Sequence, residues 1–186
     1  MIIETERLTL RPFAEADADD VYEYLEKPAV NCFVSMKLNS LEDARAEMKK
    51  RSSETEYYFA IALKDTGKVI GEIFAHPEPD EPHADTTSPC DTFSPCWMLN
   101  LNYTSQGYAY EAARAFFDYL FYEKGARRIY AYTDDYNKPS QHLCEKLGMR
   151  REGFFIEFMS FVNNPDGTPH YENTYQYAIL KKEWQG

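Results

Sequence analysis

Between an expected strand and an amphipathic helix stands the stretch Thr104-Ser105-Gln106-Gly107-Tyr108-Ala109-Tyr110-Glu111-Ala112. We expect the helix to run from Tyr108 to Glu123, because apolar residues recur there at helical spacing and Gly125 is a typical stop signal. The first turn of a helix has unpaired N–H groups at the positive end of the helix dipole. Gly107 and Ala109 let a phosphate approach this backbone closely, so the stretch is a candidate anion-binding loop.

About thirty residues further on, a second motif, Asn137-Lys138-Pro139-Ser140, opens a helix expected over 139–147. Proline in the first turn and Gly148 just past the end are typical boundaries of a helix. Asn137 is either a helix cap or a ligand of polar groups. The hydroxyl of Ser140 can reach a ligand or its own backbone. Taken alone, the motif is explained as well by helix capping as by function.

The rest of the pattern predicts a mixed α/β fold. Alternating or continuous apolar runs predict strands at 7–12, 57–63, 69–75, 97–103, 128–133, 152–162 and 171–180. Further helices are expected over 17–27 and, after a capping box at Ser40, through about residue 51. Helices that alternate with strands imply a partly parallel sheet, and hairpins imply antiparallel parts. We expect one domain over residues 1–186, with a long loop at 76–95 that contains five prolines and five acids.

The overall charge excludes several classes of protein. The chain has 20 basic and 31 acidic side chains, a net charge of −11, whereas nucleic-acid binders need excess Lys and Arg. It has no apolar run of membrane-spanning length, and its first residues lack a signal-peptide pattern, so we expect no membrane association and a cytoplasmic location. The four cysteines have no metal-ligand spacing, so no metal is expected.

Basic side chains are concentrated in residues 114–151, which carry eight Lys or Arg against five acids. This asymmetry indicates either an anionic ligand held by the middle of the chain or two solvated helix faces.

Taken together, the two motifs resemble the GNAT family of acyl-coenzyme-A-dependent N-acetyltransferases. The segment SQGYAYEAA at 105–113 is similar to the tail of the family's coenzyme loop, and NKPSQHLCEKLGM at 137–149 to its second helix motif. The opening ETERLTLRPF at 4–13 and the ending YQYAILKKEW at 175–184 resemble the branch of ribosomal-protein alanine N-acetyltransferases. The resemblance covers nearly the whole chain.

The resemblance implies a mixed, partly antiparallel central sheet, flanked by helices and splayed between two parallel strands, 97–103 and 128–133. The gap would hold the pantetheine arm of acetyl-coenzyme A, bound by the backbone near Leu99 and Leu101. The pyrophosphate would be bound by the backbone of Gln106, Gly107, Tyr108, Ala109 and Tyr110. Asn137 and Ser140 would contact the coenzyme from the other side of the gap.

The implied reaction moves the acetyl group of acetyl-coenzyme A to a primary amine, most of which is protonated at pH 7. Glu72 and Glu157, each in an expected strand, are candidates to accept that proton, directly or through water. Ser140 is the candidate that protonates the leaving thiolate. Cys144 stands where many members have a tyrosine for this task, and Tyr132 where some relatives have a basic Glu. The sequence therefore leaves the assignment of the catalytic residues open.

Three functions fit this sequence. The first is an N-acetyltransferase acting on a protein N-terminus or a small peptide. The second acts on a small amine, such as a polyamine, an amino acid or an aminoglycoside. The third is a non-catalytic acyl-coenzyme-A-binding module that has kept the fold. The acceptor and a possible homodimer are left open.

Overall fold

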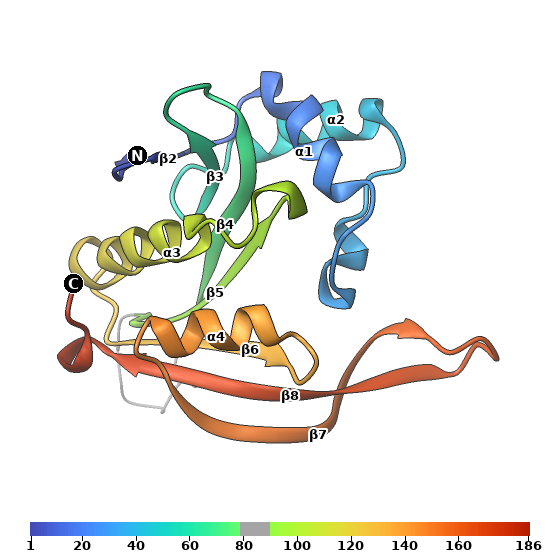
Figure 1. Cartoon of the computed structure of the whole chain (residues 1–186), viewed down its shortest axis with the longest axis vertical. Coiled ribbons are helices and arrows are strands. Elements are labelled where there is room, and N and C mark those ends of the chain that lie inside the picture. The colour runs from blue at the N-terminus through green and yellow to red at the C-terminus, as the bar shows by residue number, and fades with distance from the viewer. Residues whose placement is uncertain (79–89) are drawn as a thin grey trace.

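A computed structural model describes residues 1–78 and 90–186, which form one eight-stranded sheet with helices on both faces (Figure 1). In spatial order the strands are β1 (Ile3–Glu4), β2 (Leu8–Arg11), β3 (Tyr58–Leu63), β4 (Val69–Glu78), β5 (Thr92–Leu99), β6 (Arg128–Asp134), β8 (Pro169–Leu180) and β7 (Arg150–Asn163). Among these strands, neighbours run antiparallel except β5 and β6, which are parallel. The expected mixed, partly antiparallel sheet is confirmed.

The parallel pair β5 and β6 separates soon after it begins. Their register holds two residue pairs, Thr92 with Arg128 and Phe93 with Ile129. The backbone N–H groups of β5 point alternately to β4 and to β6. Because the N–H of Asn100 bonds to β4, the backbone of Phe93 and of Pro95 points to β6, and Pro95 is the next position there after Phe93. A proline has no N–H to donate, so the ladder with β6 cannot continue there. The splay that the family resemblance implies is thereby confirmed.

The prediction of a loop over residues 76–95 is partly wrong. β4 continues through Pro77 to Glu78, and β5 begins at Thr92. The N–H of Ala75 bonds to the carbonyl of Tyr57, on the β3 side of β4. The backbone of Pro77, two residues further on, points to the same side, but it lies beyond the last residue pair of β3 and β4. Strands accept proline at such open edges. Residues 79–89, which include three of the five loop acids, lie outside the described residues.

The helices lie in two pairs on opposite faces of the sheet. α1 (Ala18–Leu25) and α2 (Leu41–Arg51) cover one face, while α3 (Tyr108–Asp118) and α4 (Lys138–Lys146) cover the other (Figure 1). The expected cap at Ser40 is present, since its hydroxyl oxygen accepts the N–H of Asp43 at 3.1 Å. A 3-10 helix over Asn31–Met36 packs against β7.

The helix expected to reach Glu123 changes form after Asp118. Residues Tyr119–Glu123 form a π-helical turn, closed by the N–H of Lys124 on the carbonyl of Tyr119 at 3.1 Å. Tyr119, Leu120 and Phe121 are consecutive and all buried. An α-helix turns about 100° per residue and points three successive side chains over a wide arc, so the wider turn lets all three reach the core.

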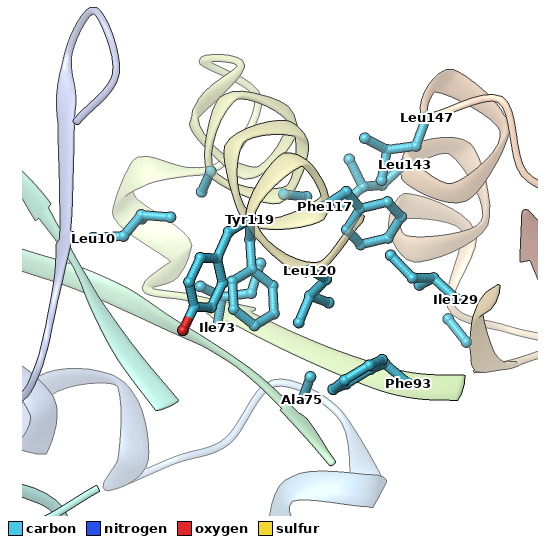
Figure 2. Close-up of a cluster of buried hydrophobic side chains, with 14 of the residues drawn as sticks. Leu10, Ile73, Ala75, Phe93, Phe117, Tyr119, Leu120, Ile129, Leu143 and Leu147 are labelled. Atoms are coloured by element: carbon cyan, nitrogen blue, oxygen red, sulfur yellow. The ribbon is translucent and has the colours of Figure 1, made fainter. Parts of the chain in front are cut away.

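The core is double because side chains alternate across each strand. On β3, Phe59 and Ile61 face α3, whereas Ala60 and Ala62 face α1 and α2. Figure 2 shows the larger cluster, in which Phe117 of α3 lies beside Leu143 and Leu147 of α4, while other side chains reach the strands. The packing of α3 and α4 against each other and against the sheet therefore holds the first turns of both helices in place.

Candidate active site

The loop before α3 has the backbone of an anion site. Gly107, the residue before the helix, has φ of +84°, and Ser105 has φ of +60°. Such values suit glycine, and Ser105 holds a left-handed backbone although it carries a side chain. The N–H groups of Tyr108, Ala109 and Tyr110 have no acceptor among the described residues. They are therefore available to an anion at the helix N-terminus.

Arg7 fixes this loop from the side, a role that sequence reasoning missed. Its guanidinium donates to the carbonyl of Gln106 at 3.0 Å and to Glu111 at 2.7 Å, and lies 4.4 Å from the ring centre of Tyr108. Partial burial of Glu111 acts to raise the pKa of its carboxyl. Hydrogen bonds from Thr5 and Arg7 outweigh this and hold the pKa below its usual value. These contacts of Arg7 hold the loop in place and leave its free N–H groups unoccupied.

A surface hollow of about 480 Å³ beside Gly107 is lined by charges of both signs: the acids Glu4, Glu6, Glu111 and Asp118 and the cations Arg7, Arg114 and Lys146. Arg114 and Lys146 line it and make no ion pair with the described residues, while Lys146 lies 4.3 Å from the ring centre of Tyr110. Other basic residues of 114–151 do pair with carboxylates: Lys124, Arg127, Arg128, Arg150 and Arg151. Lys138 instead donates to the backbone carbonyl of Asp135. The basic residues of this stretch that line the hollow without a carboxylate partner among the described residues are therefore Arg114 and Lys146.

A pocket of about 270 Å³ lies in the gap where β5 and β6 part. β5 contributes Cys96 and Trp97, β6 contributes Tyr132 and Asp134, and α4 contributes Asn137 and Ser140. Of the residues expected at the site, Asn137 and Ser140 line this pocket, while Gly107 and Tyr110 line the hollow beside α3.

At the α4 end of the pocket, Ser140 is held from two sides. The indole N–H of Trp97 donates to its hydroxyl oxygen at 3.1 Å, and the Asn137 side chain accepts its backbone N–H at 3.3 Å. A hydroxyl that accepts this bond keeps its own proton for another acceptor. Alternation along β5 also turns the backbone of Trp97 and Leu99 to the gap. Leu101 instead lies in a 3-10 helix with 65% of its surface exposed and lines neither hollow.

Glu72 lies in a different setting from the one a general base needs. It is fully buried, and its oxygens accept from the hydroxyl of Tyr24 at 2.9 Å, the hydroxyl of Tyr58 at 2.7 Å and the guanidinium of Arg51 at 2.8 Å. It does not line the pocket. A general base must reach the proton that it removes, so this position does not favour the role expected for Glu72.

Glu157 is exposed and also lies outside the pocket lining. Its φ is +49°, in an irregular part of β7, and its backbone N–H donates to the side chain of Asn173 at 2.9 Å. Its role as a base stays a prediction.

The two departures from the family pattern have different surroundings. Cys144 is fully buried in the core beside α3, and this burial raises the pKa of its thiol to about 12. Tyr132 lines the pocket, and its hydroxyl accepts from the amide of Gln176 at 3.2 Å. Neither residue supplies a carboxylate.

Sequence reasoning missed the acids that lie nearest to the pocket. Asp134 lines it, and Glu172 is a close acidic neighbour whose charge acts on Asp134. Both are about 95% buried. Burial and the negative charge of Glu172 raise the pKa of Asp134 to about 6. The signal in the sequence was an acid at the end of a strand, three residues before Asn137.

The sequence profile of the acetyltransferase (GNAT) domain matches residues 7–150. The chain belongs to the GNAT acetyltransferase family. It is 35% identical over 184 residues to an uncharacterized N-acetyltransferase of Bacillus subtilis, YnaD, with 99% of each chain covered. The family, the fold and the enzyme class expected from the sequence, an N-acetyltransferase, are thereby confirmed.

Solved structures agree with this GNAT fold. The chain is 31% identical to a GNAT acetyltransferase from Bacillus anthracis, with a TM-score of 0.80 and coverage of 98% of this chain and 100% of that one. A ribosomal-protein-S5-alanine acetyltransferase from Vibrio fischeri has the same fold, with a TM-score of 0.71, 16% identity and full coverage of both chains.

Within residues 1–78 and 90–186, no helix is long and apolar enough to cross a membrane, and no group of three or more His, Cys, Asp or Glu is placed to hold a metal ion.

Proposed function

We propose that this GNAT enzyme transfers the acetyl group of acetyl-coenzyme A to the N-terminal amine of a protein or peptide. The observation that carries the proposal is the pocket between β5 and β6. It joins Ser140, at the start of α4, to Asp134, whose side chain lies on the other face of the sheet by strand alternation. A thioester and an amine can meet in such a passage from opposite sides.

The donor side offers groups that fit the parts of acetyl-coenzyme A. The free N–H groups at the start of α3 suit the pyrophosphate, and the cations Arg114 and Lys146 stand beside them. The unpaired backbone of Trp97 and Leu99 suits the amides of the pantetheine arm. Asn137 and Ser140 would then lie near the thioester. These are the residues that the sequence motifs implied, with Trp97 in place of Leu101.

The walls of the pocket favour an N-terminal amine over a polyamine or an aminoglycoside. They include the apolar side chains of Phe33, Met36, Phe74, Met159 and Phe161. Asp134 is the acid among the lining residues. One ammonium group with an apolar neighbour suits this lining, whereas an acceptor with several charges would place some of them against apolar walls at a cost in free energy.

In the reaction, the neutral amine nitrogen attacks the thioester carbonyl carbon. The C–N bond forms, the C–S bond breaks, and the sulfur leaves with the electron pair. The Trp97 bond leaves the hydroxyl proton of Ser140 available, which supports Ser140 as the donor of a proton to that sulfur.

A panel of amines tests this proposal, with release of free coenzyme-A thiol as the readout. The panel contains hexapeptides that begin with Ala or Ser, the same peptides N-acetylated as controls, spermidine, L-alanine and kanamycin. We expect the free hexapeptides to give the highest kcat/KM and the blocked ones to be inert. Higher kcat/KM for spermidine, L-alanine or kanamycin would refute the N-terminal acceptor and select the small-amine enzyme.

A melting scan separates an enzyme from a binding module. Saturating acetyl-coenzyme A at one hundred times its dissociation constant should stabilise the fold by about 2.7 kcal/mol. Stabilisation without thiol release for any amine would indicate a non-catalytic module. A cytoplasmic location and a homodimer stay predictions, to be checked by cell fractionation and by mass in solution.

A further inference from the structure

We propose that Asp134 accepts the proton of the acceptor amine and that Glu172 is a positioning residue that tunes it. This inference rests on the proposed function, because it names the proton acceptor of the same reaction. Asp134 ends β6, and Glu172 lies on the neighbouring strand β8.

The two carboxylates have no paired cation in the part of the chain that the structure describes. Asp134 is 5% exposed and Glu172 is 4% exposed, and neither forms an ion pair with a Lys, Arg or His of residues 1–78 and 90–186. Glu172 accepts from the amide of Asn31, and the hydroxyl of Tyr136 lies 3.4 Å from its other oxygen. Two buried negative charges without a counter-ion are unfavourable, and a bound ammonium group would relieve that cost.

An independent observation points to a polar ligand at the same place. Thr174 is only 2% exposed, and its buried hydroxyl has no hydrogen-bond partner among the described residues. Thr174 stands directly opposite Asp134 in the register of β6 and β8, and both line the pocket. Buried hydroxyls are normally satisfied, so this one marks a position that a polar group from outside can fill.

The groups facing Asp134 raise its pKa toward the working range of an enzyme. Burial acts first and the charge of Glu172 second, while the hydroxyl of Tyr136 acts in the opposite sense and Asp135 adds a smaller upward effect; the resulting pKa is about 6. The thiol of Cys32 also faces this group, and burial followed by the charge of Asp134 raises its pKa to about 12, so it stays neutral. A base with a pKa near ambient pH combines the correct protonation state with proton affinity.

The protons of the reaction balance with this assignment. The acceptor enters as an ammonium ion and gives one proton to the carboxylate of Asp134, which leaves a neutral nitrogen. That nitrogen forms the C–N bond, the C–S bond breaks, and the thiolate takes a proton from Ser140. The second nitrogen proton replaces the one lost by Ser140, and Asp134 releases its proton to solvent. The products are the amide, free coenzyme A and one proton.

The test compares three variants across pH 5 to 9 with the best acceptor of the amine panel. Asp134→Asn removes the proposed base with little change of shape. Glu172→Gln removes the neighbouring charge but leaves Asp134. Asp135→Asn is the matched control, because this acid is adjacent to Asp134 but does not line the pocket. Melting scans with acetyl-coenzyme A accompany every variant, so that loss of fold or of donor binding is seen separately.

We expect kcat/KM of the parent to fall as pH drops below about 6, since Asp134 must be ionised to accept a proton. Asp134→Asn should lower kcat/KM at pH 8 by at least about a hundredfold and remove that acid limb. Glu172→Gln should move the limb to lower pH, because a negative neighbour no longer raises the pKa of Asp134. Asp135→Asn should change kcat/KM at pH 8 by no more than about threefold, well below the range for loss of a base. It should move the limb less than Glu172→Gln does, because Asp135 has the smaller effect on the pKa of Asp134.

Parent-like kcat/KM in Asp134→Asn, or an unmoved limb in Glu172→Gln, would overturn the inference while leaving the acetyltransferase intact. If Asp134→Asn fails to fold, the limb in Glu172→Gln decides the question alone. If no amine of the panel releases thiol with the parent protein, the proposed function falls first, and this inference falls with it.

Discussion

The indole N–H of Trp97 donates to the hydroxyl oxygen of Ser140 across 3.1 Å, and so joins β5 to the first turn of α4 over the splay. The bond orients the hydroxyl and leaves its proton free. It connects the two strand–helix units of the site at the point where the thioester is expected.

Replacing Ser140 tests this arrangement. Ser140→Ala should lower kcat by about a hundredfold, the lower end for loss of a general acid, with little change in the KM for acetyl-coenzyme A. Ser140→Thr keeps a hydroxyl and should retain more of the rate. Steady-state kinetics of thiol release measure both variants. A kcat for Ser140→Ala within twofold of the parent would assign the proton to another donor.

Gly107 offers a test of the phosphate loop with a matched control. Gly107→Ala forces a side chain onto a φ of +84° and places a Cβ 3.3 Å from the guanidinium of Arg7. Gly67 has a similar φ of +74° in a turn with open space around it. Both alanine variants should lose about 1 kcal/mol of stability, but only Gly107→Ala should weaken acetyl-coenzyme A binding by calorimetry. Equal affinity in the two variants would place the phosphates elsewhere.

Glu72 should matter for stability more than for catalysis. Glu72→Gln leaves the buried guanidinium of Arg51 without its fully buried partner, and breaking such a pair costs about 3–5 kcal/mol. Glu47→Gln removes the more exposed partner of the same arginine and should cost less than about 1 kcal/mol. Urea denaturation measures both. A thousandfold loss of kcat in folded Glu72→Gln, with stability unchanged, would show that Glu72 is the base after all.

Asp134 should make the protein less stable at high pH. Its folded pKa of about 6 lies above the ordinary value of 3.8, so the folded state holds the proton more tightly than the unfolded chain does. This contribution therefore favours folding less as pH rises from about 4 to 6, and the loss persists at pH 8. Asp134→Asn should accordingly be roughly 3 kcal/mol more stable than the parent at pH 8 and close to it at pH 4. The same difference at both pH values would contradict the raised pKa.

Much of the fold could be predicted from the sequence because the signals were local. The cap at Ser40, the proline at the start of α4 and the alternation of β6 each report on a few adjacent residues. The prolines at 77 and 95 misled because their acceptability depends on which strand edge they face. That depends on pairing with β3 and β6, from residues that are distant in the sequence.

The site was predictable where it uses backbone and helix caps, and less so where it uses side chains from separate strands. Gly107 and Asn137 carry their roles in their own local conformation. The pairing of Asp134 with Thr174 and the approach of Glu172 arise from the register of β6 and β8. Glu72 was a plausible base by strand position, but its contacts with Arg51 are made from α2.

A crystal structure with coenzyme A tests the central claim most directly. We predict the pyrophosphate on the backbone of Gln106–Tyr110, the pantetheine arm in the gap between β5 and β6, and the sulfur within hydrogen-bond distance of the Ser140 hydroxyl. A coenzyme bound with its sulfur outside that gap, away from both Ser140 and Asp134, would contradict the account.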